Sequence, residues 1–233
     1  MFPLKDNVPH RRFPVMNVSI IIFNFIIFLY QTQLPREELH QFIANYSVVP
    51  LEQVQGMQLL FQQPALALYL GSQLLFPYIS ATFLHGSWMH LIGNMIYLWV
   101  FGDNIEDRLG PLRYLAVYLL MGVVGHLFHL ASAPFSQVPL IGASGAIAGV
   151  LGAYFVLYPR ARVLTLVPLG FFITFIYIPA FLFLALWFLL QLFNAITPAA
   201  PAGAQSVAWW AHVGGFFSGV IMGAFMSRQL PNN

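Results

Sequence analysis

The chain has 233 residues, of which 59% are hydrophobic and 7% are charged, whereas a soluble domain has about 25% charged residues. With a mean hydropathy of +0.76 it has too few charges to cover itself with a water-compatible surface, so we expect an integral membrane protein. The formal net charge of +2 gives no indication of nucleic-acid binding. The absence of cysteine excludes disulfides, thiolate chemistry and cysteine-ligated metals.

Apolar segments bounded by charges, proline or glycine predict six membrane-spanning helices, since a spanning helix needs about 20 apolar residues. They are expected at 14–33, 87–102, 112–131, 143–158, 171–195 and 206–227. The first run is too long for a signal peptide and no small-residue cleavage site follows it, so we expect it to remain as an anchor. Pro179 falls inside the fifth span, where we expect a kink. The predicted fold class is all-α, with a six-transmembrane-helix bundle in a single domain over 1–233.

The basic residues predict the orientation of this bundle. All but Arg36 fall on one side of the predicted topology: Lys5, Arg11, Arg12, Arg108, Arg113, Arg160, Arg162 and Arg228. The positive-inside rule places that side in the cytoplasm. We therefore expect both termini to be cytoplasmic, with a short N-terminal segment at 1–13 and a tail at 228–233.

The external connection at 34–86 is unusually apolar for a loop. It contains "MQLLFQQPALALYLGSQLLFPYIS" and carries no charge after Glu52. We expect short amphipathic helices that lie partly in the outer leaflet of the membrane. The alternative is an extra pair of spanning helices.

Polar side chains inside membrane spans are costly, and they are therefore candidates for function. Four histidines fall in predicted spans: His90, His126, His129 and His212. Asn94 follows His90 by one helical turn and so shares its helix face. Counted from the cytoplasmic helix ends at 1.5 Å per residue, Ser144, His212 and His90 lie at heights of about 22, 24 and 20 Å. Three polar groups on three helices are thus expected at one level, below the outer membrane surface.

This convergence suggests nucleophilic catalysis. A serine hydroxyl becomes a nucleophile when a neighbouring base takes its proton, and a neutral histidine does this near pH 7. Ser144 could pair with either His90 or His212, and the other histidine, with Asn94, could stabilise an oxyanion. The predicted spans contain no aspartate or glutamate, so a dyad is the most that the sequence allows.

Two structural interpretations compete with catalysis. Ser144 lies in "LIGASGAIAG", where Gly142, Gly145 and their small neighbours would allow close helix packing in any case. A histidine in a span is often a hydrogen-bonded core residue, and we expect this status for His126 and His129, whose spacing is only a weak metal signal. Zinc proteases with a His-Glu-x-x-His motif and proteases with paired intramembrane aspartates are excluded by the sequence. No internal repeat of the transporter type is found.

The chain resembles the rhomboid intramembrane serine proteases over nearly its whole length. The resemblance is carried by "GASG" at 142–145, "HGSWMHLIGNM" at 85–95 and "AHVGGFFSG" at 211–219. Two further stretches, "GDNIEDRLGPLRY" at 102–114 and "YPRARVLTLVPLGFF" at 158–172, are similar to those of bacterial rhomboids.

The resemblance implies roles for individual residues. Ser144 would be the nucleophile and His212 the general base, while His90, Asn94 and the backbone N–H of Ser144 would form the oxyanion hole. Gly215 and Gly219 would bring the sixth helix close to the fourth, and His85 would have a structural or water-binding role. The sequence departs from the family at Ala148, where many members carry an aromatic residue that packs against the base.

The resemblance also implies a function, which we state as an expectation. Rhomboids cleave single-span membrane proteins near the outer face of the bilayer without a metal or other cofactor. We expect such substrates here, no nucleic-acid partner, and a bacterial inner membrane as the location. A mobile cap at 196–205 and a lateral gate on the fifth span are expected to control entry. The alternative function is that of an inactive rhomboid-like protein that binds transmembrane clients.

Overall fold

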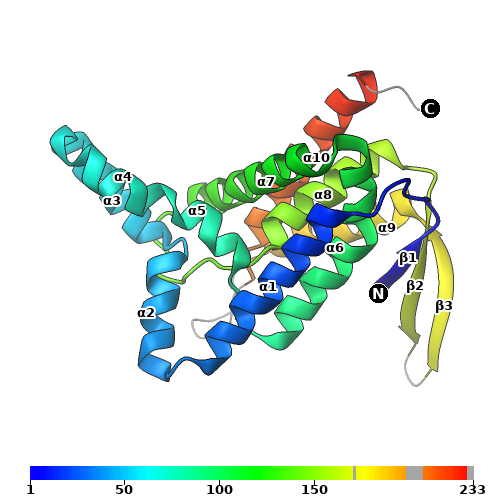
Figure 1. Ribbon diagram of the computed structural model, residues 1–233, viewed down its shortest axis with the longest axis horizontal. Helices are drawn as coiled ribbons and strands as arrows, with labels where there is room; N and C mark the ends of the chain where they lie inside the picture. Colours follow the sequence, from blue (N-terminus) through cyan, green and yellow to red (C-terminus); the bar gives the residue numbers. More distant parts are fainter. Residues whose placement is uncertain (170–171, 198–206, 230–233) are drawn as a thin grey trace.

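The computed structural model describes residues 1–169, 172–197 and 207–229, and it is largely helical (Figure 1). The long helices are α1 (Val15–Gln33), α6 (Trp88–Leu109), α7 (Pro111–Ser132), α8 (Ser144–Leu157), α9 (Ala180–Ile196) and α10 (Trp209–Gln229). Helix α8 contacts α6, α7, α9 and α10. Most of its residues are buried, so α8 is the central helix of the bundle.

Length and composition are compatible with membrane crossing for part of the bundle. Among the described residues, α1 and α7 are long and apolar enough to span a bilayer, and α8 and α9 are shorter apolar helices. Helix α6 carries charged residues at its C-terminal end, from Asp103 to Arg108. The six-span count and the orientation therefore stay predictions. The C-terminal ends of α6, α8 and α10 and the N-terminal ends of α1 and α7 lie at one end of the bundle in Figure 1, as that orientation requires.

The segment 34–86 forms short helices, as its composition suggested. They are α2 (Arg36–Tyr46), α3 (Pro50–Gln62), η1 (Pro64–Leu66), α4 (Ala67–Leu75), α5 (Pro77–Ser80) and η2 (Ala81–Phe83). The longest has 13 residues, too few to span a bilayer, which argues against an extra transmembrane pair. Phe61 is 90% exposed and Leu75 70% exposed. Their apolar side chains are suited to the membrane interface, which remains the predicted location of this segment.

The expectation of an all-α fold is wrong in one region. Strands β1 (Phe2–Asp6), β2 (Arg162–Leu169) and β3 (Phe172–Pro179) form an antiparallel sheet in the order β1-β2-β3. The N-terminal segment, expected only as a cytoplasmic extension, supplies β1, in which Phe2 pairs with Leu166 and Asp6 with Val163. The fifth span is thus not a kinked helix over 171–195, because α9 begins at Ala180, directly after Pro179.

The physical reason is that a continuous apolar run has no hydrophobic periodicity from which a strand could be told from a helix. The stretch from 162 to 179 is rich in β-branched and aromatic residues, which favour strands. Proline lacks a backbone N–H and suits the residue before a helix rather than its interior. These two signals are the ones that could have separated β3 from α9.

A polar network joins the helix ends near the N-terminus. The carboxylate of Glu106 accepts hydrogen bonds from the backbone N–H groups of Met16 and Asn17, at 3.0 and 2.7 Å. It thereby satisfies free donors in the first turn of α1. Asn17 in turn donates to the carbonyl of Leu98 at 3.0 Å and accepts from the hydroxyl of Tyr114 at 2.7 Å. These bonds tie α1 to α6 and α7.

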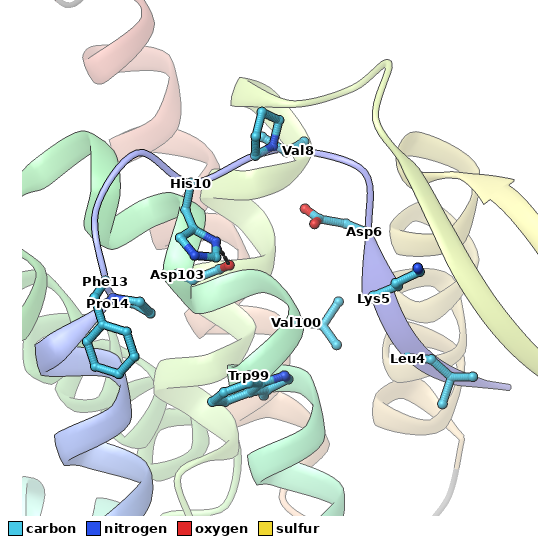
Figure 2. Close-up of a pocket in the computed structure, with 11 residues that line it drawn as sticks. Leu4, Lys5, Asp6, Val8, His10, Phe13, Pro14, Trp99, Val100 and Asp103 are labelled. Carbon is cyan, nitrogen blue, oxygen red and sulfur yellow. Dashed lines mark ion pairs between the residues drawn. The ribbon is translucent and has the colours of Figure 1, made fainter.

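The N-terminal segment encloses a pocket against α6 (Figure 2). Asp6 bonds the Tyr154 hydroxyl and accepts from the Asn104 amide at 2.9 Å. His10 lies 3.2 Å from Asp103, as the dashed line in Figure 2 shows. Burial, with a smaller contribution from the nearby Asp6 carboxylate, raises the pKa of Asp103 to about 6. This pocket adjoins the charged end of α6, whereas His90 and Asn94 lie toward the opposite end of that helix.

Candidate active site

Ser144 and His212 form a hydrogen-bonded pair where α8 and α10 begin. Ser144 is the first residue of α8, and His212 lies in the first turn of α10. The Nε2 atom of His212 is 2.8 Å from the Oγ atom of Ser144. His212 is buried and Ser144 is partly exposed. Of the two histidines that spacing left open as partners of Ser144, the structure therefore pairs His212 with it.

Glycines allow α10 to approach α8 closely enough for this pair to form. A Cβ atom built on Gly215 would overlap the carbonyl oxygen of Gly145, and one on Gly219 would overlap that of Gly149. The backbones of the two helices are thus in direct contact. The small residues around Ser144 allow close helix packing, as one of the two structural interpretations of the sequence predicted. The same close packing brings His212 to the serine.

The backbone before Ser144 has a conformation that requires glycine. Gly142 has φ +128°, a region that other residues rarely adopt, and its N–H donates to the Ala81 carbonyl at 2.8 Å. A Cβ atom there would lie 2.8 Å from the Nε2 atom of His90 and 3.7 Å from Ser144 Oγ. The His90 ring thus lies against the Gly142 backbone, next to the serine.

Asn94 is oriented by a contact that sequence reasoning did not predict. Its Nδ2 atom lies 3.0 Å from the Nε2 atom of His85, and His85 is only 1% exposed. The backbone of His85 is held by the Gln31 side chain of α1, which accepts from its N–H at 3.1 Å and donates to its carbonyl at 3.2 Å. Because an amide nitrogen carries two donors, Asn94 retains one for a further acceptor.

His212 packs against aromatic side chains even though α8 has Ala148 where many rhomboids have an aromatic residue. The imidazole packs between two indoles instead of against an aromatic on α8: the ring centroids of Trp187 and Trp209 lie 6.0 and 5.9 Å away. Its Nδ1 atom is 2.8 Å from the Oε1 atom of Gln191. Sequence reasoning missed Trp187 and Gln191, although an amide side chain within a predicted span was a detectable signal.

Of the remaining histidines in the predicted spans, His126 has a contact away from Ser144. The Nδ1 atom of His126 is 2.9 Å from the Tyr78 carbonyl, which fits the expected structural role. The predicted cap at 196–205 falls largely outside the described residues, as do the last four residues of the tail.

Comparison with known proteins decides the family. The Rhomboid domain matches residues 72–229, which include both members of the Ser144–His212 pair. The chain belongs to the rhomboid family. Rhomboids are membrane-embedded, so this chain is a membrane protein. The matched residues include the helices α6 to α10 and the strands β2 and β3.

The rhomboid is similar to several curated proteins of eukaryotes. It is 33% identical over 159 residues to the "Rhomboid protein 1, mitochondrial" of Saccharomyces cerevisiae, covering 65% of this chain and 42% of that protein. It is 32% identical over 146 residues to the human "Presenilin-associated rhomboid-like protein, mitochondrial", covering 62% and 36% respectively. The chain thus spans less than half the length of these relatives. Since both are mitochondrial, they do not support the bacterial inner membrane, and the membrane location alone is retained.

Proposed function

We propose that this rhomboid is an intramembrane serine endopeptidase that cleaves transmembrane segments of membrane proteins near the outer face of the bilayer. The observation that carries the proposal is the 2.8 Å contact between Ser144 Oγ and His212 Nε2. A nucleophile within hydrogen-bond reach of its base is the minimal apparatus for acyl transfer.

In the proposed mechanism, Ser144 Oγ attacks the scissile carbonyl carbon while its proton passes to His212 Nε2. The tetrahedral intermediate then collapses to a serine ester as His212 returns that proton to the leaving amine. A water molecule, deprotonated by His212, attacks the ester, and the second intermediate releases the carboxylic acid and restores Ser144. Two product chains result, and no external reductant, oxidant or metal is consumed.

Donors around Ser144 suit the stabilisation of the oxyanion. The backbone N–H of Ser144 lies at the start of α8, where helix N–H groups have no partner within the helix and the helix dipole favours negative charge. His90 and Asn94 supply side-chain donors from α6. The position of His90 against Gly142 supports its assignment to the oxyanion hole, and Asn94, one turn further along α6, has a second amide donor beyond its contact with His85. Gly142 and Gly145 support the site as conformational and packing residues.

The proposal is tested by proteolysis of a reporter with a single transmembrane segment, co-reconstituted with the rhomboid in liposomes. Wild-type protein should cut the reporter within or beside that segment, and Ser144→Ala and His212→Ala should each abolish the cut while retaining the wild-type helical circular dichroism. Cleavage by Ser144→Ala at the wild-type rate would overturn the proposal. If the wild-type protein retained the reporter without cutting it, the client-binding alternative would apply instead.

A further inference from the structure

The imidazole of His212 has two ring nitrogens, and only one of them contacts Ser144. The other, Nδ1, lies 2.8 Å from the Oε1 atom of Gln191. Gln191 belongs to α9, whereas Ser144 and His212 belong to α8 and α10. Three helices thus contribute to one chain of hydrogen bonds, which runs from Gln191 through His212 to Ser144.

The orientation of the Gln191 amide is fixed by its second contact. Its Nε2 atom donates to the backbone carbonyl of Trp187, one turn earlier in α9, at 3.2 Å. A carbonyl oxygen is only an acceptor, so the amide nitrogen must face Trp187 and the amide oxygen must face His212. The reversed amide would place two acceptors against each other.

The amide orientation determines where the proton lies on His212. Since Gln191 Oε1 is an acceptor, Nδ1 of the neutral imidazole carries the hydrogen and donates it. The lone pair is then on Nε2, facing the hydroxyl of Ser144, which is the tautomer that a general base needs. The opposite tautomer would leave Nε2 protonated and unable to accept the serine proton.

Because both residues are buried, losing the contact between Gln191 and His212 should affect the state of the imidazole. Gln191 is 8% exposed and His212 is 7% exposed, so water has little access to replace a lost partner of Nδ1. Asn194, one turn further along α9, also donates to the carbonyl four residues before it, at 2.6 Å, but it is exposed. The chain therefore provides a matched amide on the same helix that does not contact the imidazole.

We infer that Gln191 is a positioning residue of the proposed protease. It fixes the tautomer and ring orientation of His212 and is thereby a third, uncharged residue beside Ser144 and His212. This inference rests on the proposed function. It extends the dyad expected from the sequence to a hydrogen-bonded Gln191–His212–Ser144 triad, in which Gln191 takes up no proton and no buried charge is needed to orient the base. It also means that a displacement of α9 would change the basicity of His212.

The test compares Gln191→Met, which keeps the length of the side chain but removes the acceptor, with Gln191→Glu, which keeps an acceptor oxygen in either protonation state. Asn194→Leu is the control for loss of an amide on α9. For each variant in liposomes, the rate of fluorophosphonate labelling of Ser144 and the kcat and KM for the reporter are measured, together with the thermal unfolding midpoint.

Loss of one buried hydrogen bond to the base should lower the labelling rate and kcat of Gln191→Met about tenfold with little change in KM. Gln191→Glu should restore most of the rate, and Asn194→Leu should match wild type. Nitrogen-15 NMR of the His212 ring should show a single tautomer in wild type and a mixture in Gln191→Met.

The outcomes separate this inference from the proposed function. If wild-type protein is labelled and Gln191→Met is labelled at the same rate, the positioning role is refuted while the protease remains. An equal loss in Gln191→Met and Gln191→Glu, with an unchanged His212 tautomer, would also refute it. If wild-type protein neither reacts at Ser144 nor cuts the reporter, the proposed function itself fails.

Discussion

A single methyl group at Gly215 should disrupt the site without touching any polar residue in it. Gly215 lies three residues after His212 on α10. A Cβ atom there would overlap the Gly145 carbonyl oxygen and would lie 3.0 Å from its carbon and 3.2 Å from the Cβ atom of Ala148. All three obstacles belong to α8, whose interior packing leaves no room for local adjustment.

The size of the effect follows from this geometry. To bring the oxygen contact to 3.0 Å, the closest approach that Cβ atoms ordinarily show, α10 must move away from α8 by about 1 Å. The contact between Ser144 and His212, now 2.8 Å, would then exceed hydrogen-bond range. A displacement of about 1 Å at a reacting group costs about 10²-fold in rate, and we expect kcat to fall by at least this factor in Gly215→Ala.

The assay is the initial rate of reporter cleavage in liposomes, with the thermal unfolding midpoint as the measure of folding. Gly223→Ala is the control on the same helix, because a Cβ atom there lies 3.0 Å from the Ala153 carbonyl oxygen and needs a shift of only a few tenths of an ångström. It should retain most of the activity. If the cleavage rate of Gly215→Ala lay within threefold of the wild-type rate, the close contact between α10 and α8 at Gly215 would not be what holds His212 at Ser144, and this explanation would be refuted.

Two further predictions concern opposite ends of α6. Asn94→Ala should lower kcat by about 10²–10³-fold with a smaller change in KM, because one oxyanion donor is lost; an unchanged kcat would remove Asn94 from the site. Asp103→Asn should raise the thermal unfolding midpoint at pH 8 and leave it nearly unchanged at pH 4. Burial raises the pKa of Asp103 from 3.8 to about 6, so this carboxyl contributes stability fully below about pH 4 and loses it as pH rises through 6. The raised pKa corresponds to up to about 3 kcal/mol at pH 8, and an equal gain at both pH values would contradict this explanation.

Sequence patterns located most of the bundle but misjudged the segment between α8 and α9. The predicted spans at 14–33, 112–131 and 143–158 agree closely with α1, α7 and α8, because charges and prolines mark their ends. The run from 162 to 196 carries no charge after Arg162, and its breaks at Pro168, Gly170 and Pro179 do not indicate which side is strand and which is helix. The sheet also includes β1, a strand about 160 residues away in sequence that no local pattern could pair with β2.

For the candidate site, the sequence predicted the depth of the side chains in the bundle but not their orientation. Counting residues from the helix ends was enough to place Ser144, His90 and His212 at one level, since the rise of a helix is constant. It did not determine which histidine faces the serine, because that depends on how α10 is rotated and on the close contact at its glycines. Gln191 was missed because its position on the face of α9 depends on where that helix begins, which the hairpin determines.

The most direct test of the account is to identify the residue that a fluorophosphonate modifies in the folded protein in a bilayer. Mass spectrometry of the labelled protein should find the phosphonyl group on Ser144 alone, and His212→Ala should remove the labelling while the helical content is retained. Modification of other serines, or labelling of His212→Ala at the wild-type rate, would contradict the assignment of Ser144 as a nucleophile activated by His212.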